Sequence, residues 1–240
     1  MLGINWMLVA AVLPSLLLGF YIWRKDPHPE PVGMIIRAAL AGMVICVPVA
    51  YAEEWISSLL FADGTAHTLL GTTVDAFCVA ALPEEAAKLL VLWLLLRRNP
   101  HFDEHFDGIV YAVFVSLGFA TVENIGYVYS SGDAWLSTAV TRAFLAVPGH
   151  YAFAIIMGYY YSVHHFVNRS AGYAVKTLLA PVMVHGIYDA LALSGTVDPV
   201  VGSIAFFVLL YFCYKMQKEA QRKITAMLNS QSSSFPDALA

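Results

Sequence analysis

Long apolar segments separated by short polar connections make up most of this chain. Seven segments are long enough to cross the hydrocarbon core of a bilayer, which takes about 20 apolar residues in a helix. They lie near residues 2–23, 32–52, 72–96, 108–130, 137–163, 172–194 and 198–215. The first is not a cleavable signal peptide, because it has no basic start and Arg24-Lys25 follow it. The pattern predicts an all-α, polytopic membrane helix bundle with seven transmembrane helices.

The basic residues predict the orientation of these helices. Of the 13 Lys and Arg, Lys88 and Arg142 lie inside spans, and the others gather at alternate span ends. Those others are Arg24, Lys25, Arg37, Arg97, Arg98, Arg169, Lys176, Lys215, Lys218, Arg222 and Lys223. The opposite connections, around Asp63, Asp133 and Asp198, contain no Lys or Arg. By the positive-inside rule the N-terminus lies outside and the C-terminus lies in the cytoplasm.

Composition agrees with a membrane protein and indicates one domain. Of the 240 residues, 59% are hydrophobic and 12% are charged, whereas soluble domains carry about 25% charged residues. The three cysteines lie in apolar stretches, so they predict neither a disulfide framework nor a cysteine zinc cluster. We expect a single transmembrane domain over residues 1–215, with its polar layer within 80–190. Residues 216–240 are expected to form a cytoplasmic basic helix and a disordered tail.

Several ionisable side chains interrupt the apolar segments. Glu84, Glu85 and Lys88 lie in the third segment, and spacings of three and four place them on one side of a helix. A charge at the centre of a membrane helix costs roughly 2.5–3.5 kcal/mol, so such residues indicate a functional site with charged partners. The other ionisable residues inside spans are Glu123, Arg142, His150, His185 and Asp189.

These residues reach similar depths in the membrane. At 1.5 Å per residue, Glu84 lies roughly 18–20 Å from the cytoplasmic end of its helix, and Glu123 lies about 22 Å from the same side. His185 and Asp189 are four residues apart, so they share a face and Asp189 can orient the imidazole. Taken singly, each of these residues can also be explained by contacts that only hold helices together. Asn124 can be explained in the same way, by hydrogen bonds between helices. Together, on four helices, they indicate a functional cluster in the middle to outer half of the membrane.

Two other polar groups are interpreted as structural. The pair Glu53-Glu54 follows about twenty apolar residues and precedes Trp55, which is typical of an outer interface with an aromatic anchor. The loop 101–107 contains His, Asp and Glu but joins two spans. We interpret it as a solvated connector that leads into a helix starting at Asp107-Gly108.

The ordered motifs resemble those of the PrsW family of intramembrane proteases. Glu84-Glu85-Ala86-Ala87-Lys88 is similar to the family's Glu-Glu-x-x-Lys signature, and residues 106–111 and 118–125 are similar to its next helix. Residues 142–150 and 185–189 resemble its later two, so the match covers roughly 80–190. The resemblance implies a glutamate-dependent peptidase of the bacterial plasma (inner) membrane, related to CAAX-processing and bacteriocin-immunity membrane proteases. Family members perform site-1 cleavage of a membrane-bound anti-sigma factor.

Hydrolysis of a peptide bond assigns roles to these residues. It needs a base that activates water, donors for the oxyanion, and an acid for the leaving amine. No Ser or Cys lies beside a base in the polar layer, so a covalent mechanism is not expected. The expected catalytic residues are Glu84, Glu85, Glu123, His150 and His185. The expected supporting residues are Lys88, Asn124, Arg142 and Asp189.

Within this set, some roles stay open. We expect Glu84 or Glu85 to activate the water while the other faces Lys88 or Arg142. His150 and His185 would bind a metal, donate to the oxyanion or protonate the amine, and Asn124 is a second candidate donor.

A metal-free mechanism is favoured over a zinc site. His150 and His185 with Glu85 or Glu123 would satisfy a zinc ligand set. Against it, there is no His-Glu-x-x-His helix, and the ligands would come from separate spans. The expected partners are the lipid bilayer and a single-span membrane protein substrate, for which the resemblance implies an anti-sigma factor. No nucleic-acid partner is expected.

Two other functions remain open. Buried carboxylates and histidines on several helices also form proton relays in ion- or proton-coupled transporters. Such carriers commonly contain two related halves, whereas no internal repeat is visible here and seven spans do not divide evenly. A non-catalytic membrane scaffold or immunity protein would keep the fold but would not need an intact glutamate pair.

Overall fold

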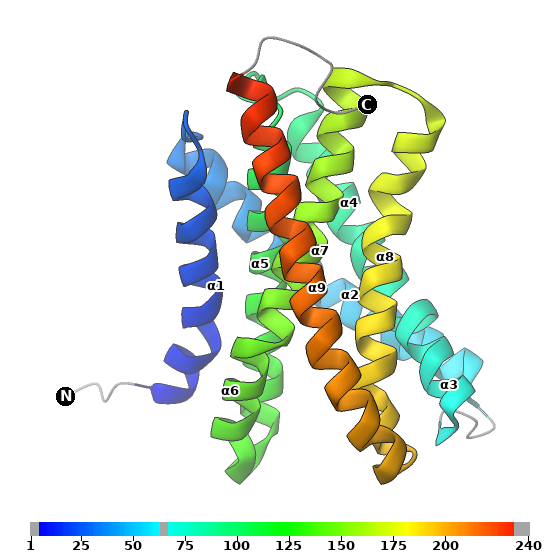
Figure 1. Cartoon of the computed structure of the whole chain (residues 1–240). Helices are drawn as coiled ribbons and strands as arrows, with labels where there is room; N and C mark the ends of the chain where they lie inside the picture. The colour runs from blue at the N-terminus through cyan, green and yellow to red at the C-terminus, as the bar shows by residue number, and fades with distance from the viewer. Residues whose placement is uncertain (1–4, 63–66, 233–240) are drawn as a thin grey trace.

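Helices account for the regular structure of this chain. A computed structural model describes residues 5–62 and 67–232, with side chains to residue 230, and within these ranges it contains no strands. Figure 1 shows the helices side by side in a bundle, with α1 at one edge, α3 at the other and α9 crossing the front. The long single helices are α1 (Trp6–Lys25), α2 (Val32–Leu60), α5 (Asp107–Ser130), α8 (Ala171–Leu193) and α9 (Pro199–Ser232).

Two further crossings are each divided into consecutive elements. One consists of α3 (Leu69–Val74), the π-helix η2 (Asp75–Ala81) and α4 (Leu82–Leu96). The other consists of the 3₁₀ turn η3 (Gly132–Ala134), α6 (Trp135–Phe144), α7 (Ala146–Ser162) and the π-helix η4 (Val163–Val167). A last 3₁₀ turn, η5 (Ser194–Thr196), joins α8 to α9.

Length and hydropathy qualify six helical segments as candidate membrane spans among the described residues. The predicted span at 72–96 is outside these six, although α3, η2 and α4 follow one another without a break over residues 69–96. It carries Asp75, Glu84, Glu85 and Lys88, too many charged residues to qualify as a candidate span by composition. The all-α membrane bundle is confirmed, while the number of spans and the orientation stay predictions.

The polarity of the bundle is the reverse of that of a water-soluble protein. Large apolar side chains such as Val44 and Phe207 are 71% and 72% exposed on its outside. Glu85 and Lys88, by contrast, are 0% and 1% exposed at its centre. A protein surrounded by hydrocarbon gains nothing from hiding apolar side chains, but it must satisfy its polar groups internally. The exposed apolar surface therefore agrees with a lipid environment.

The basic residues mark one end of the bundle, here named the basic end. α1 ends at Arg24 and Lys25, α4 ends just before Arg97, and α8 begins just after Arg169. These points lie together at the top of Figure 1. The other end, named the non-basic end, holds the connections around Asp133 and Asp198; Asp63 falls outside the described residues.

The predicted helix after residue 215 is not a separate element. α9 continues without interruption from Pro199 to Ser232. Four of its residues, at spacings of three and four, are buried against the bundle: Met216, Ala220, Ile224 and Met227. Gln217 Nε2 also donates to Pro148 O at 2.7 Å. Most of the predicted disordered tail, residues 233–240, falls outside the described residues.

α5 is the most buried of the candidate spans, and glycines let a neighbouring helix approach its backbone. Where α2 crosses α5, a Cβ on Gly42 would lie 1.9 Å from Val115 O, and one on Gly118 would lie 2.1 Å from Ala39 O. Both obstructing atoms belong to backbone, so no side-chain rotation can make room. Small residues at such crossings are typical of membrane helix packing. The contact sets the distance between α2 and α5, the helices that carry Glu53 and Glu123.

Gly118→Ala should destabilise the protein by about 1–3 kcal/mol, because the added methyl group forces the two helices apart. Gly126→Ala is the matched control on the same helix, where a Cβ meets no atom within 4 Å. It should leave stability unchanged or raise it, since Ala is the better helix former. Thermal unfolding in detergent measures both, and equal melting temperatures for the two variants would contradict the proposed contact.

Candidate active site

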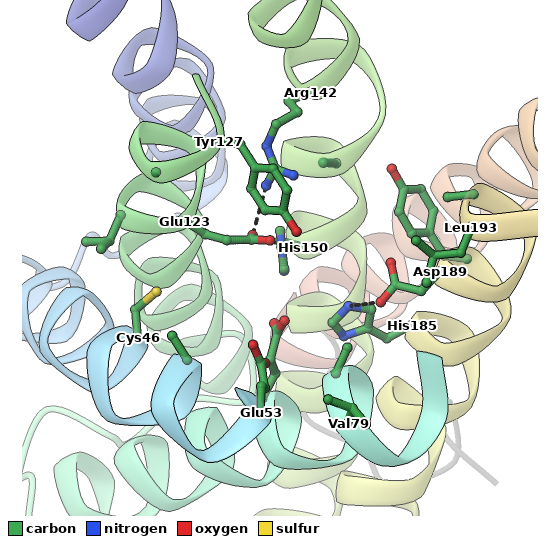
Figure 2. A pocket seen from close by; sticks show the side chains of 18 of the residues that line it. Cys46, Glu53, Val79, Glu123, Tyr127, Arg142, His150, His185, Asp189 and Leu193 are labelled. Atoms are coloured by element: carbon green, nitrogen blue, oxygen red, sulfur yellow. Dashed lines mark hydrogen bonds and ion pairs between the residues drawn. The ribbon is translucent and has the colours of Figure 1, made fainter. Parts of the chain in front are cut away.

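A cavity of about 840 Å³ lies among α2, η2, α4, α5, α6, α7 and α8 (Figure 2). Its lining includes six of the nine predicted site residues: Glu84, Glu123, Arg142, His150, His185 and Asp189. On α5 the lining runs from Val122 to the last residue, Ser130, and on α8 it runs from His185 to Leu193. The cavity therefore extends from the polar cluster toward the non-basic end of the bundle.

The local helix geometry changes just before the two glutamates. The chain forms a π-helix over Asp75–Ala81, then continues as α4, with Pro83 in its first turn. Proline has no backbone N–H, so it fits where the regular helical bonding pattern is already interrupted. Glu84 and Glu85 follow directly, and both are buried.

The Lys88 ammonium lies at the centre of the cluster. Its Nζ is 2.7 Å from Glu84 Oε2, 2.8 Å from Glu85 Oε1 and 3.2 Å from His150 Nδ1. An ammonium has three N–H donors and no acceptor, so these contacts use every donor it has. Its Nζ also lies 4.3 Å from the centre of the Phe119 ring, within range of a cation–π interaction. One cation thus joins α4, α5 and α7.

The contacts of His150 assign its tautomer. Since the Lys88 ammonium can only donate, Nδ1 of His150 is the acceptor and its proton lies on Nε2. Nε2 then donates to Glu123 Oε2 at 2.8 Å. The imidazole is neutral, and both of its nitrogens are engaged.

His185 lies between two carboxylates. Its Nδ1 is 3.0 Å from Glu85 Oε1 and its Nε2 is 3.1 Å from Asp189 Oδ2, so the predicted contact with Asp189 is present. Both ring nitrogens face acceptors, which makes the ring a doubly protonated imidazolium when the carboxylates are ionised. The ring also stacks on Phe153, with 4.6 Å between centroids. His185 therefore carries the second buried positive charge of the cluster.

The two adjacent glutamates differ in their access to the cavity. Among the described residues, Glu84 belongs to the cavity lining and Glu85 does not. The expectation that one glutamate would face Lys88 and the other the water is only half right, because both contact Lys88. Glu85 binds Lys88 and His185 together, whereas Glu84 presents its carboxylate to both Lys88 and the cavity. Of the two, Glu84 is the one that can reach a water molecule.

Asn124 is not a donor into the cavity, so that prediction is wrong. Its Nδ2 donates to Ala11 O at 2.7 Å, and its Oδ1 accepts from Arg142 Nε at 2.7 Å. Arg142 in turn lies over the Tyr127 ring, 4.1 Å from its centre. The Arg142 Nη2 is 2.9 Å from Glu123 Oε2, although the angle does not make a hydrogen bond. Asn124 thus holds the arginine that lines the cavity.

The interface interpretation of Glu53 is also wrong. Glu53 lines the cavity, and its Oε1 is buried without a hydrogen-bond partner. In Figure 2 its side chain points into the cavity from α2, below Glu123 and His150. The spacing of the apolar residues on α2 contained a signal for this position. The buried face runs through residues 35, 38, 42, 46 and 49, so the next residue on that face is 53.

One group of potential metal ligands exists among the described residues. Donor atoms of Glu84, Glu85 and His150 all lie within 4.8 Å of one another. Lys88 Nζ contacts an oxygen or nitrogen of each of these residues, so its ammonium fills the space between them. The residues therefore do not fit a metal ion in this arrangement. His185, which belonged to the predicted zinc set, has both nitrogens engaged by carboxylates.

Comparison with known proteins identifies a family and several relatives. The sequence model of the PrsW family of intramembrane metalloproteases matches residues 30–214. A Protease PrsW from Geobacillus kaustophilus is 37% identical over 187 residues, which cover 77% of this chain and 79% of that protein. A Protease PrsW from Oceanobacillus iheyensis is 34% identical over 223 residues, covering 90% and 97%. One from Bacillus subtilis is 30% identical over 221 residues, covering 91% and 96%. No solved structure matches the chain.

Lys88→Met should destabilise the protein by about 3–5 kcal/mol, because it leaves two buried carboxylates without their common cation. The double variant Glu85→Gln/Lys88→Met removes a charge of each sign and should lose less stability than the single one. Unfolding in a detergent titration measures both. A Lys88→Met protein as stable as the unaltered one would contradict the central position of the ammonium.

Proposed function

The chain belongs to the PrsW family of intramembrane proteases, and on that basis we propose that it cuts membrane-anchored proteins near the outer side of the bilayer. It is a peptidase and a multi-pass membrane protein. The observation that supports the proposed place of cleavage is the direction of the cavity. It runs from Glu84 to the non-basic end, which is the outer end under the positive-inside rule. The membrane is proposed to be the bacterial plasma (inner) membrane.

The base in this proposal is Glu84. Its carboxylate lies on the cavity wall and takes a proton from a water molecule, whose oxygen attacks the peptide carbonyl carbon. Lys88 fixes the carboxylate in place with a 2.7 Å contact. Glu85 is fully buried and acts through Lys88 and His185, which it positions.

Arg142 is proposed to stabilise the oxyanion. It is a cation on the cavity wall, and its Nη2 is buried with no hydrogen-bond partner. This nitrogen lies 2.9 Å from Glu123 Oε2 in an ion pair without a hydrogen bond, so its N–H is oriented in advance and can stabilise developing negative charge with little reorganisation. Asn124, Tyr127 and Glu123 hold the guanidinium in position. His150 joins this group to Lys88 through its two ring nitrogens.

Catalysis is proposed to proceed without a metal. The family's description as metalloproteases implies a metal ion, and its ligands here would be Glu84, Glu85 and His150. Lys88 supplies positive charge at the place where that ion would lie. Activity should therefore survive a strong chelator such as EDTA. Activity that is lost with the chelator and restored by zinc would contradict this proposal.

The proposed substrate is a single-span membrane protein, and an anti-sigma factor is the substrate class that the family resemblance implies. A cut near the outer end of its span would make this a first, site-1 cleavage in stress signalling. Co-expression with tagged single-span proteins identifies the substrate, because a fragment should appear with the unaltered protein and not with Glu84→Gln. The new end of the fragment should lie at or just beyond the outer end of the span.

Glu84→Gln should lower the rate of cleavage by a factor of about 10²–10⁴, the usual contribution of general acid–base catalysis. Glu85→Gln should lower it as well, because Glu85 positions Lys88 and His185. Both proteins should still insert and fold, because Gln keeps the shape of the side chain. Glu219→Gln is the control, since Glu219 is an exposed glutamate on α9 remote from the cavity lining. Retained cleavage in both active-site variants would refute the glutamate mechanism.

Access to the cavity can be measured with two glycines, in a protein that lacks Cys46, Cys78 and Cys213. Gly126 lines the cavity and Gly33 lies at the basic end, and a Cβ on either meets no atom within 4 Å. In intact cells, Gly126→Cys should react with a membrane-impermeant thiol reagent, whereas Gly33→Cys should react only after the cells are opened. The reverse pattern would contradict the proposed orientation.

A further inference from the structure

Glu53 and Arg142 share an unusual feature on the cavity wall. Of the described residues that line the cavity, these two have a buried polar side-chain atom without a hydrogen-bond partner. Arg142 Nη2 is a cationic donor, whereas Glu53 Oε1 belongs to a carboxyl group from the opposite side of the cavity, on α2. Peptide hydrolysis needs two groups besides the base, one for the oxyanion and one to protonate the leaving nitrogen. Arg142 supplies the donor for the oxyanion, so the group that protonates the leaving nitrogen remains to be identified.

Glu53 also differs from the four carboxyl groups of the predicted site in its charge environment. Glu84 and Glu85 pair with Lys88, Glu123 pairs with Arg142, and Asp189 pairs with His185. Glu53 has no ion pair within the part of the chain that the structure describes, and the carboxylates of Glu84 and Glu123 act on it more strongly than the cations of Lys88 and His185. A partly buried carboxyl group beside other carboxylates, with no cation in direct contact, is stabilised as the neutral acid.

The other candidate proton donors among the predicted site residues are already committed. All three N–H groups of Lys88 and both of His185 are directed at acceptors. If either residue released a proton, it would leave a buried carboxylate without its donor. The neutral His150 donates its one N–H to Glu123. Arg142 Nη2 makes no hydrogen bond, but a guanidinium does not lose its proton in proteins.

We infer that Glu53 is a further catalytic residue, a neutral carboxylic acid that protonates the leaving amine; this rests on the proposed peptidase mechanism with Glu84 as base. In that step the O–H bond of Glu53 breaks and an N–H bond forms at the amide nitrogen while the C–N bond breaks. The products are a carboxylic acid and an amine, and Glu53 becomes a carboxylate. The proton that Glu84 took from water then passes to Glu53 through cavity water, which restores both groups.

The first test measures the protonation of Glu53 without using activity. The infrared difference spectrum between the unaltered protein and Glu53→Gln, both purified in detergent, should contain the carbonyl stretch of a protonated carboxylic acid. That band should shift in heavy water. Its absence at neutral pH would overturn the proposal, because an ionised Glu53 cannot donate a proton.

The second test measures cleavage of dye-labelled casein, an unfolded chain that offers many peptide bonds. Glu53→Gln should lower kcat by a factor of about 10²–10⁴ with little change in KM, and should remove the alkaline limb of the pH profile. Glu53→Asp, which keeps an acid, should recover part of the rate, and Glu219→Gln should match the unaltered protein. Unchanged kcat in Glu53→Gln, or a loss that leaves the shape of the pH profile intact, would overturn the role.

The two tests also separate this inference from the proposed function. A protein that shows the infrared band but cuts neither casein nor a co-expressed membrane protein would refute the peptidase mechanism and, with it, the proton-donor role. A protein that cuts casein and is inactivated by Glu84→Gln but not by Glu53→Gln would keep the proposed function and lose this inference.

Discussion

The buried ammonium of Lys88 is the interaction on which the rest of this structure depends. Glu84, Glu85 and His150 come from two helices, and each places an acceptor within 3.2 Å of one nitrogen. In hydrocarbon, two adjacent carboxylates would be very costly without a cation between them. Once Lys88 is placed, the tautomer of His150, its bond to Glu123 and the contact of Glu123 with Arg142 follow in turn. The polar centre is therefore one connected network rather than a set of separate pairs.

The fold supports this network in two ways. It brings helix backbones close together, and it leaves a cavity beside the network. The glycine contact of α2 with α5 brings Glu53 and Glu123 to facing walls of one cavity. The cavity extends only along the parts of α5 and α8 that lead to the non-basic end. Water and a substrate backbone can meet Glu84 there, while Lys88 and Glu85 stay sealed from solvent. The same arrangement fixes the positions of Lys88 and Glu85 and excludes water from them.

Sequence reasoning could predict features that depend on helix geometry alone. The rise per residue placed Glu84, Glu123, His150 and His185 at matching depths, and the four-residue spacing placed Asp189 beside His185. It could not predict which partners those side chains choose, because that depends on how helices rotate against one another. Asn124 lies near the cluster in depth but faces α1, so its expected role as a cavity donor is wrong.

Two other predictions from the sequence also differ from the structure, and the cause of each lies within a single helix. Glu53 was assigned to the membrane interface from its neighbours Glu54 and Trp55, although it is half-buried and lies on the same face of α2 as the buried residues before it. Residues after 215 were expected to form a basic helix outside the transmembrane domain. They continue α9, because Met216, Ala220, Ile224 and Met227 form an apolar stripe that packs on the bundle. In each case the face of the helix mattered more than the composition of the segment.

The most direct test of the central claim is an experimental structure of the active, unaltered protein, with X-ray data collected on both sides of the zinc absorption edge. The account predicts Lys88 Nζ between Glu84, Glu85 and His150, with no anomalous peak there. A metal peak bound by Glu84, Glu85 and His150, with the lysine directed elsewhere, would contradict it.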